Sequence, residues 1–157
     1  MEIFGKPAIN PVLFYSGNII GYMNWTLLVL SVLSINIPGR HIFFHNDYMA
    51  IGLLLTGVLI SSASMFYLGR STRFGLPTSR TILKTNGMYR FSRNPMYLGF
   101  DLVTLASMIW FLNPPLICTG VYSIVVYHLI IKAEEKFLEG TFGTEYLEYK
   151  KEVRRYI

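Results

Sequence analysis

Three long stretches with almost no charged side chains constrain this chain more than any other feature. No Asp, Glu, Lys or Arg occurs at positions 7–39 or 48–69, and positions 96–131 contain only Asp101. The hydrocarbon core of a bilayer is about 30 Å thick and takes roughly 20 apolar residues of helix to cross. Charged residues make up 15% of the chain, against about 25% in a typical soluble domain. The pattern therefore predicts an all-α integral membrane protein.

The third stretch is about twice as long as one membrane helix needs, and Asn113-Pro114-Pro115 interrupts it. Proline lacks a backbone N–H and restricts the residue before it, so this tripeptide predicts a tight turn between two helices. We expect a multi-pass membrane helical bundle that ends in a helical hairpin, in one domain covering 1–157. The predicted membrane helices cover residues 14–37, 48–69, 95–112 and 115–132.

The basic residues predict the orientation of the chain. Six lie in the loop 70–95, which contains no acid, and six more lie between 132 and 155, whereas the loop 38–47 has only Arg40. Cytoplasmic segments carry the excess of positive charge in membrane proteins. With four spans, we expect both termini on the cytoplasmic side of a cell inner membrane, or of the endoplasmic reticulum in a eukaryote. The net charge of +5 is thus interpreted as topology. Membrane lipids are the expected partners, nucleic acid is not, and no oligomeric state is predicted.

Residues 1–69 are interpreted as scaffold helices. Gly57, Ser61 and Ser64 lie near one face of the second predicted helix, and small residues favour close packing between membrane helices. A substrate groove along this face is the alternative. Asn24 and Asn36, in the first predicted helix, are expected to form hydrogen bonds between helices or to lie at the membrane interface rather than to bind a ligand.

Residues 70–157 are interpreted as the catalytic loop, hairpin and tail. Asn94 is a suitable N-cap, and Pro95 suits the first position of a helix. The free N–H groups at such a helix start, with Arg90 and Arg93 beside them, attract a carboxylate or phosphate. The alternative is that these arginines only anchor the helix in lipid headgroups, and the local sequence favours neither.

Counting outward from Pro114 places residues of the two hairpin helices at similar depth, because both helices rise equally per residue. Arg93 and Asn94 stand 21 and 20 residues before this proline, and Glu134 and Glu135 stand 20 and 21 after it. The hairpin is therefore expected to place a basic helix start beside two carboxylates at the membrane surface. A zwitterionic ligand, with one carboxylate and one ammonium group, fits these two walls.

The same count places Asp101 level with Tyr127 and His128, within the apolar region. Ionisable groups inside a membrane span are costly and often functional. A hydrogen-bonded Asp101–His128 pair that holds the hairpin together, and a direct role in ligand binding or proton transfer, both remain open. His41 and His45 lie in the opposite loop, and no set of four convergent ligands predicts a metal site.

Apolar side chains in the tail recur at intervals of four and three residues: Phe142, Tyr146, Tyr149, Val153 and Tyr156. This spacing predicts one amphipathic helix on the cytoplasmic side. We expect it to rest against the protein, and a lid over the site is the alternative.

The run Gly-Met-Tyr-Arg-Phe-Ser-Arg-Asn-Pro-Met-Tyr-Leu-Gly, residues 87–99, resembles a known signature, G-P-Y-R-x-x-R-[HN]-P-x-Y-x-G. It belongs to the isoprenylcysteine carboxyl methyltransferase and phospholipid methyltransferase family. The tail is similar to the second block of that family at Glu134-Glu135, Phe142-Gly143, Tyr146 and Tyr149. The resemblance implies S-adenosylmethionine as cofactor and a lipid-like acceptor, either a prenylcysteine-type carboxylate or a phospholipid amine. By matching position it implies that the following residues bind the cofactor: Gly87, Tyr89, Asn94, Pro95, Tyr97, Gly99, Glu134 and Glu135.

Methyl transfer would be an in-line displacement at a sulfonium methyl group, so the protein mainly positions donor and acceptor. Arg93 and Glu135 are the predicted catalytic residues. Arg93 would orient an acceptor carboxylate or phosphate, and Glu135 would accept a proton from an amine. Two residues depart from the signature: Met88 replaces the commoner proline, and Asn94 stands where prenylcysteine enzymes have histidine. A nicotinamide-dependent membrane reductase and a non-catalytic membrane scaffold are the alternative functions.

Overall fold

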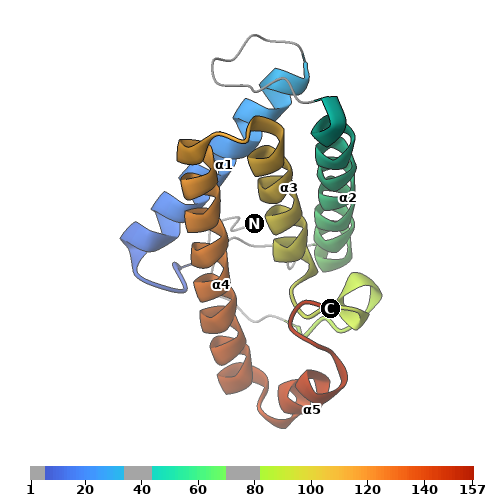
Figure 1. Ribbon diagram of the computed structural model, residues 1–157. Helices are drawn as coiled ribbons and strands as arrows, with labels where there is room; N and C mark the ends of the chain where they lie inside the picture. The colour runs from blue at the N-terminus through green and yellow to red at the C-terminus, as the bar shows by residue number, and fades with distance from the viewer. Residues whose placement is uncertain (1–5, 34–43, 70–81) are drawn as a thin grey trace.

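The computed structural model describes residues 6–33, 44–69 and 82–157, with the side chains of 44–46 excepted. Its regular elements are all helical, as the sequence predicts (Figure 1). They are α1 (Pro11–Val32), α2 (Phe44–Leu68), the 3₁₀ turn η2 (Gly87–Arg90), α3 (Pro95–Phe111), α4 (Pro114–Phe142) and α5 (Thr144–Glu152). Asn36, Arg40 and His41 lie outside the described residues, as do Arg70, Arg73 and Arg80 of the basic loop 70–95, and the side chain of His45 is not described.

Prolines begin three of the helices, as their missing N–H and fixed φ favour. In α1, the side chain of Asn10 caps the helix by accepting from the N–H of Val12 at 2.9 Å. Leu112, with φ of 45°, and Asn113 form the short connection between α3 and α4 where the tight turn was predicted. The helix α4 runs ten residues past its predicted end at 132.

Two of the described helices are long and apolar enough to cross a membrane, namely α2 from Asp47 to Leu68 and α4. The helix α3 is apolar but has only 17 residues. With 29 residues, α4 is about 43 Å long, which exceeds a bilayer core of about 30 Å. Its charged end, from Lys132 onward, therefore extends beyond an apolar part of membrane length. Large apolar side chains on the outer surface, such as Leu59 and Phe66, are 69% and 86% exposed. The arrangement of four spans stays a prediction.

The helices pack in two closely joined pairs, with α2 along α3 and α1 against α4, and α3 lies beside α4 (Figure 1). Glycines permit the close approach of α2 and α3, because a Cβ at Gly57 would lie 2.7 Å from the carbonyl oxygen of Gly99. Ser61 lies in the same contact, because a Cβ at Gly99 would meet its Oγ, and Ser64 is buried as well. The packing prediction for this face is confirmed, and a substrate groove along it is wrong because α3 fills it.

Polar contacts and aromatic rings join the two pairs. The amide Nδ2 of Asn24 donates to Thr119 Oγ1 at 3.2 Å, so the predicted interhelical hydrogen bond is confirmed. Trp25, Tyr97, Phe100 and Tyr127 form a cluster of rings whose centroids lie 4.9–6.4 Å apart. This cluster is a rigid base beneath the polar end of α3 and α4.

The predicted amphipathic tail helix is present as α5 but is shorter than its apolar stripe, of which only Tyr146 and Tyr149 lie within α5. The helix α4 ends at Gly143, whose φ of 55° and ψ of −121° suit a residue without a side chain, and α5 then runs in a new direction. Beyond α5, Val153 is extended, and the chain returns to the start of α3. Tyr146, Tyr149 and Val153 are buried against neighbouring apolar residues, which confirms that the apolar stripe rests against the protein.

Candidate functional site

The start of α3 is held by side chains and backbone from the tail and from α4. Asn94 occupies the predicted N-cap position, but its side chain does not cap the helix. Its Nδ2 instead donates to Glu135 Oε1 at 3.0 Å and to the carbonyl of Arg155 at 3.3 Å. The backbone N–H of Asn94 donates to the hydroxyl of Ser92 at 3.1 Å. Oδ1 of Asn94 does not accept from the free N–H groups of the helix, whereas its Nδ2 donates to a buried carboxylate, and a hydrogen bond to a charged acceptor is stronger than one to a neutral acceptor.

Arg93 connects α4 to the tail. Its Nε and Nη2 both lie 3.1 Å from Glu135 Oε1, and its Nη1 donates to the carbonyls of Val153 at 2.7 Å and Lys150 at 3.2 Å. Its backbone N–H donates to the carbonyl of Arg154 at 2.9 Å. The side chain is only 7% exposed. Arg93 therefore faces inward, and its interpretation as a lipid headgroup anchor is wrong.

Glu135 is the anionic centre of this network and lies in the charged end of α4. Its Oε2 accepts from Nε and Nη2 of Arg155 at 3.1 and 2.8 Å, and its side chain is 4% exposed. Burial acts to raise the pKa of the carboxyl, but hydrogen bonds from Arg155 and Asn94 and the charge of Arg93 lower it below its ordinary value. Because a carboxylate with a lowered pKa is a weak proton acceptor, this environment favours a positioning role for Glu135 over the predicted base.

Glu134 has a different environment, although it is the adjacent residue. Its Oε1 accepts a hydrogen bond from the hydroxyl of Tyr97 at 2.9 Å, and Tyr97 belongs to the aromatic cluster below. The two pairs that sequence counting placed at one level, Arg93 with Asn94 and Glu134 with Glu135, thus lie in one site. The equal rise of two neighbouring helices is the physical reason.

Four more of the predicted site residues lie at contacts between elements around the helix start: Gly87, Tyr89, Pro95 and Gly99. Gly87 has φ of 63°, and a Cβ there would meet the ring of Tyr67. The hydroxyl of Tyr149 donates to the carbonyl of Tyr89 at 2.5 Å. Gly99 provides the close approach to α2. These contacts hold the helix start in place, and a direct role in cofactor binding stays a prediction.

The tail supplies site residues that sequence reasoning missed. Arg155 was counted only as one of the basic residues, yet it binds Glu135, and its carbonyl accepts from the hydroxyl of Ser92 at 3.1 Å. Tyr156 was assigned to an apolar stripe, but its hydroxyl lies 2.7 Å from Nδ1 of His128. The sequence signal was the pair of arginines next to a polar-tipped aromatic residue at the end of the tail. The partners of these residues could not be predicted, because they depend on the reversal of the chain at Gly143.

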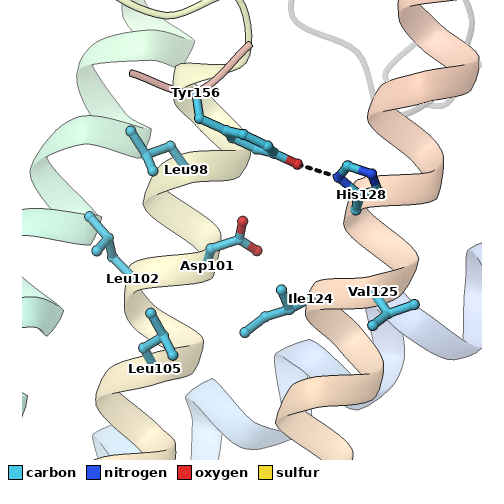
Figure 2. Close-up of a pocket in the computed structure, with 8 residues that line it drawn as sticks. All are labelled: Leu98, Asp101, Leu102, Leu105, Ile124, Val125, His128 and Tyr156. Atoms are coloured by element: carbon cyan, nitrogen blue, oxygen red, sulfur yellow. Dashed lines mark hydrogen bonds between the residues drawn. The ribbon is translucent and has the colours of Figure 1, made fainter.

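Asp101 and His128 do not form the expected pair, because His128 is bonded to Tyr156 instead (Figure 2). Oδ1 of Asp101 is buried and has no hydrogen-bond partner within the part of the chain that the structure describes. Both residues line a groove of about 570 Å³ between α3 and α4. The structure therefore leaves a direct role in ligand binding as the open alternative for Asp101.

Comparison with known proteins identifies relatives of this chain. The phospholipid methyltransferase family matches residues 46–145. Protein-S-isoprenylcysteine O-methyltransferase of Mus musculus is 32% identical over 112 residues, which are 66% of this chain and 39% of that protein. The enzyme of the same name from Schizosaccharomyces pombe is 30% identical over 110 residues, 66% of this chain and 46% of that protein. Protein-S-isoprenylcysteine O-methyltransferase A of Arabidopsis thaliana is 30% identical over 107 residues, 64% of this chain and 53% of that protein. The chain thus spans about half or less of the length of these relatives.

Proposed function

Because the chain belongs to the phospholipid methyltransferase family, we propose that it transfers a methyl group from S-adenosylmethionine to a lipid-like acceptor at the cytoplasmic membrane surface. One observation carries the proposal. The basic start of α3 and the two carboxylates of α4 meet in a single polar site at the end of an apolar helix pair. The relatives named for methyl transfer to isoprenylcysteine make a prenylcysteine-type carboxylate one candidate acceptor, and a phospholipid amine is the other.

The charges of the site fit the methionyl part of the proposed cofactor. Glu134 is an acid bonded to the protein through Tyr97 at one oxygen, and it suits an ammonium group. The guanidinium of Arg155, which binds the adjacent Glu135, is one third exposed and suits a carboxylate. When bound, S-adenosylmethionine supplies an electrophilic methyl group on a sulfonium. The residues of this chain bind and orient: Tyr97 fixes the carboxylate of Glu134, and Glu135 fixes the two arginines.

A direct experiment tests the methyl transfer. The purified protein, in nanodiscs made from host lipids, is incubated with methyl-labelled S-adenosylmethionine, and the labelled product is identified by mass spectrometry. We expect one labelled lipid or lipidated product. Binding of S-adenosylmethionine without any labelled product across host lipids and prenylcysteine analogues would contradict the proposal.

Variants of acidic residues then test the site. Glu134→Gln should weaken S-adenosylmethionine binding by about tenfold or more, because one charge-assisted hydrogen bond contributes about 1.5–3 kcal/mol. The matched control is Glu145→Gln, since Glu145 is exposed on α5. Equal affinities in the two variants would remove Glu134 from the cofactor site.

The alternative functions predict different binding. A nicotinamide-dependent reductase would bind NADPH more tightly than S-adenosylmethionine, although the two adjacent carboxylates disfavour a cofactor with several phosphates. A non-catalytic scaffold would bind neither. Titration of both cofactors against the same preparation separates the three functions.

The proposed topology is testable by labelling. Both termini are proposed to face the cytoplasm, so in a Cys118→Ser background a single cysteine placed in the loop 38–47 should react with an impermeant maleimide from the outside only. A cysteine at the exposed Glu148 of α5 should react only after the membrane is opened. Labelling of the loop from the cytoplasmic side alone would overturn the four-span arrangement.

A further inference from the structure

The groove between α3 and α4 has mostly apolar walls with polar side chains among them (Figure 2). Its apolar lining consists of Leu98, Leu102, Leu105, Ile124 and Val125, and its polar lining consists of Asp101, His128 and Tyr156. Figure 2 shows the carboxylate of Asp101 pointing from α3 into the space in front of α4. A volume of about 570 Å³ accommodates a long aliphatic chain.

Along α3, the lining of the groove is polar at Asp101 and apolar at Leu102 and Leu105. Asp101 lies seven residues after Asn94, about 10 Å along α3 from the helix start, and Leu102 and Leu105 lie farther from it. Leu105 and Val125 are 37% and 51% exposed, so the groove is open on the side that a bilayer would cover. An amphipathic molecule in this groove would place its chain against the leucines and its polar group beside Asp101, on the side of the Arg93–Glu135 site.

Asp101 determines which polar group is suitable. Its Oδ1 is buried without a hydrogen-bond partner in the described residues, and a carboxyl oxygen of this kind accepts hydrogen bonds. The neighbouring His128 uses Nδ1 for Tyr156, and none of the described residues that line the groove is a lysine or an arginine. A ligand that donates a hydrogen bond is therefore favoured, whereas a carboxylate ligand has no hydrogen to donate to this oxygen.

We propose that this groove binds a long-chain aliphatic amine and that Asp101 selects an amine over a carboxylate as the methyl acceptor. The proposal rests on the proposed function, because it names the acceptor class of the same reaction. Transfer to a neutral amine would form a C–N bond and break the C–S bond of the sulfonium donor, which leaves a thioether. One proton of the resulting ammonium is then lost to solvent.

Three probes with the same chain test the preference: hexadecylamine, hexadecanol and hexadecanoate. Their binding to the full chain in detergent is measured by native mass spectrometry at equal free concentrations. We expect hexadecylamine to bind most tightly and hexadecanoate least. Asp101→Asn should reduce the ratio of amine to carboxylate affinity about tenfold, the effect of one charge-assisted hydrogen bond. Glu148→Gln, at an exposed acid of α5, is the matched control and should keep the ratio.

A second variant keeps the test independent of charge. Leu102→Trp should fill the groove and weaken all three probes, while the S-adenosylmethionine affinity stays unchanged and thereby shows that the protein is folded. An unchanged affinity ratio in Asp101→Asn, or tighter binding of hexadecanoate in the wild type, would overturn the proposal. If host lipids are methylated without an amine preference, only this inference fails. If the amine preference is present but S-adenosylmethionine does not bind, the proposed function fails instead.

Discussion

Replacing Arg93 by lysine keeps the positive charge but removes the planar guanidinium on which the docking of the tail depends. Three nitrogen atoms of Arg93 make four side-chain contacts, two with Glu135 Oε1 and one each with the carbonyls of Val153 and Lys150. A lysine ammonium is a single point on a flexible chain and cannot reach acceptors on both sides of the site. We therefore expect Arg93→Lys to release the tail while the helices remain folded.

The size of the effect follows from the contacts that are lost. If the ammonium keeps the carboxylate and loses both carbonyls, two charge-assisted hydrogen bonds disappear, each contributing about 1.5–3 kcal/mol. The loss of about 3 kcal/mol at the lower end raises the population of the undocked tail by a factor of about 100, since 1.4 kcal/mol corresponds to tenfold. The side chain is only 7% exposed, so water replaces little of this loss.

Amide hydrogen exchange, measured by mass spectrometry on peptides covering 143–157, reports this opening. Arg93→Lys should exchange these amides about 100-fold faster than the wild type, with little change in α1 and α2. Arg154→Lys is the matched control because Arg154 is exposed in the same segment. If both variants exchange at the same rate, the guanidinium does not hold the tail and the argument from geometry is refuted.

Three further predictions concern the packing and charges around the site. Tyr97→Phe removes the hydrogen bond to Glu134 and should weaken S-adenosylmethionine binding about tenfold, since an unsatisfied buried acceptor costs about 1–3 kcal/mol. The affinity is measured by calorimetry, and an unchanged value would exclude this contact from the site. Gly57→Ala should lower the melting temperature in detergent, because the new Cβ would lie 2.7 Å from a backbone carbonyl of α3, whereas Gly52→Ala meets nothing within 4 Å and should not. The pKa of Glu135 is lowered from an ordinary value of 4.5, so its bonds contribute stability above that pH and are lost as the pH falls through the lower folded-state value. The contribution of Glu135, measured as the difference in melting temperature between the wild type and Glu135→Gln, should accordingly stay level from neutral pH to about pH 5 and fall below 4.5.

Local chemistry made the helices and one part of the site predictable from sequence. Proline cannot continue a helix but suits its first turn, so Pro95 and Pro114 mark where α3 and α4 begin. Because an α-helix has a constant rise, counting from the turn between α3 and α4 placed Arg93 level with Glu135. That calculation needs no knowledge of other parts of the chain, and the contact between the two residues agrees with it.

Hydrogen-bond partners, by contrast, were decided by the tertiary structure. Whether Asn94 caps its own helix or binds Glu135 depends on which hydrogen-bond partners lie within reach once α4 is packed. His128 pairs with Tyr156 rather than with Asp101 because the chain reverses at Gly143 and brings its last residues back to the start of α3. Helical spacing determines which residues share a face within one element. Which side chains from distant segments form a hydrogen bond depends on how closely their atoms approach. Those distances are set only after the whole chain has folded.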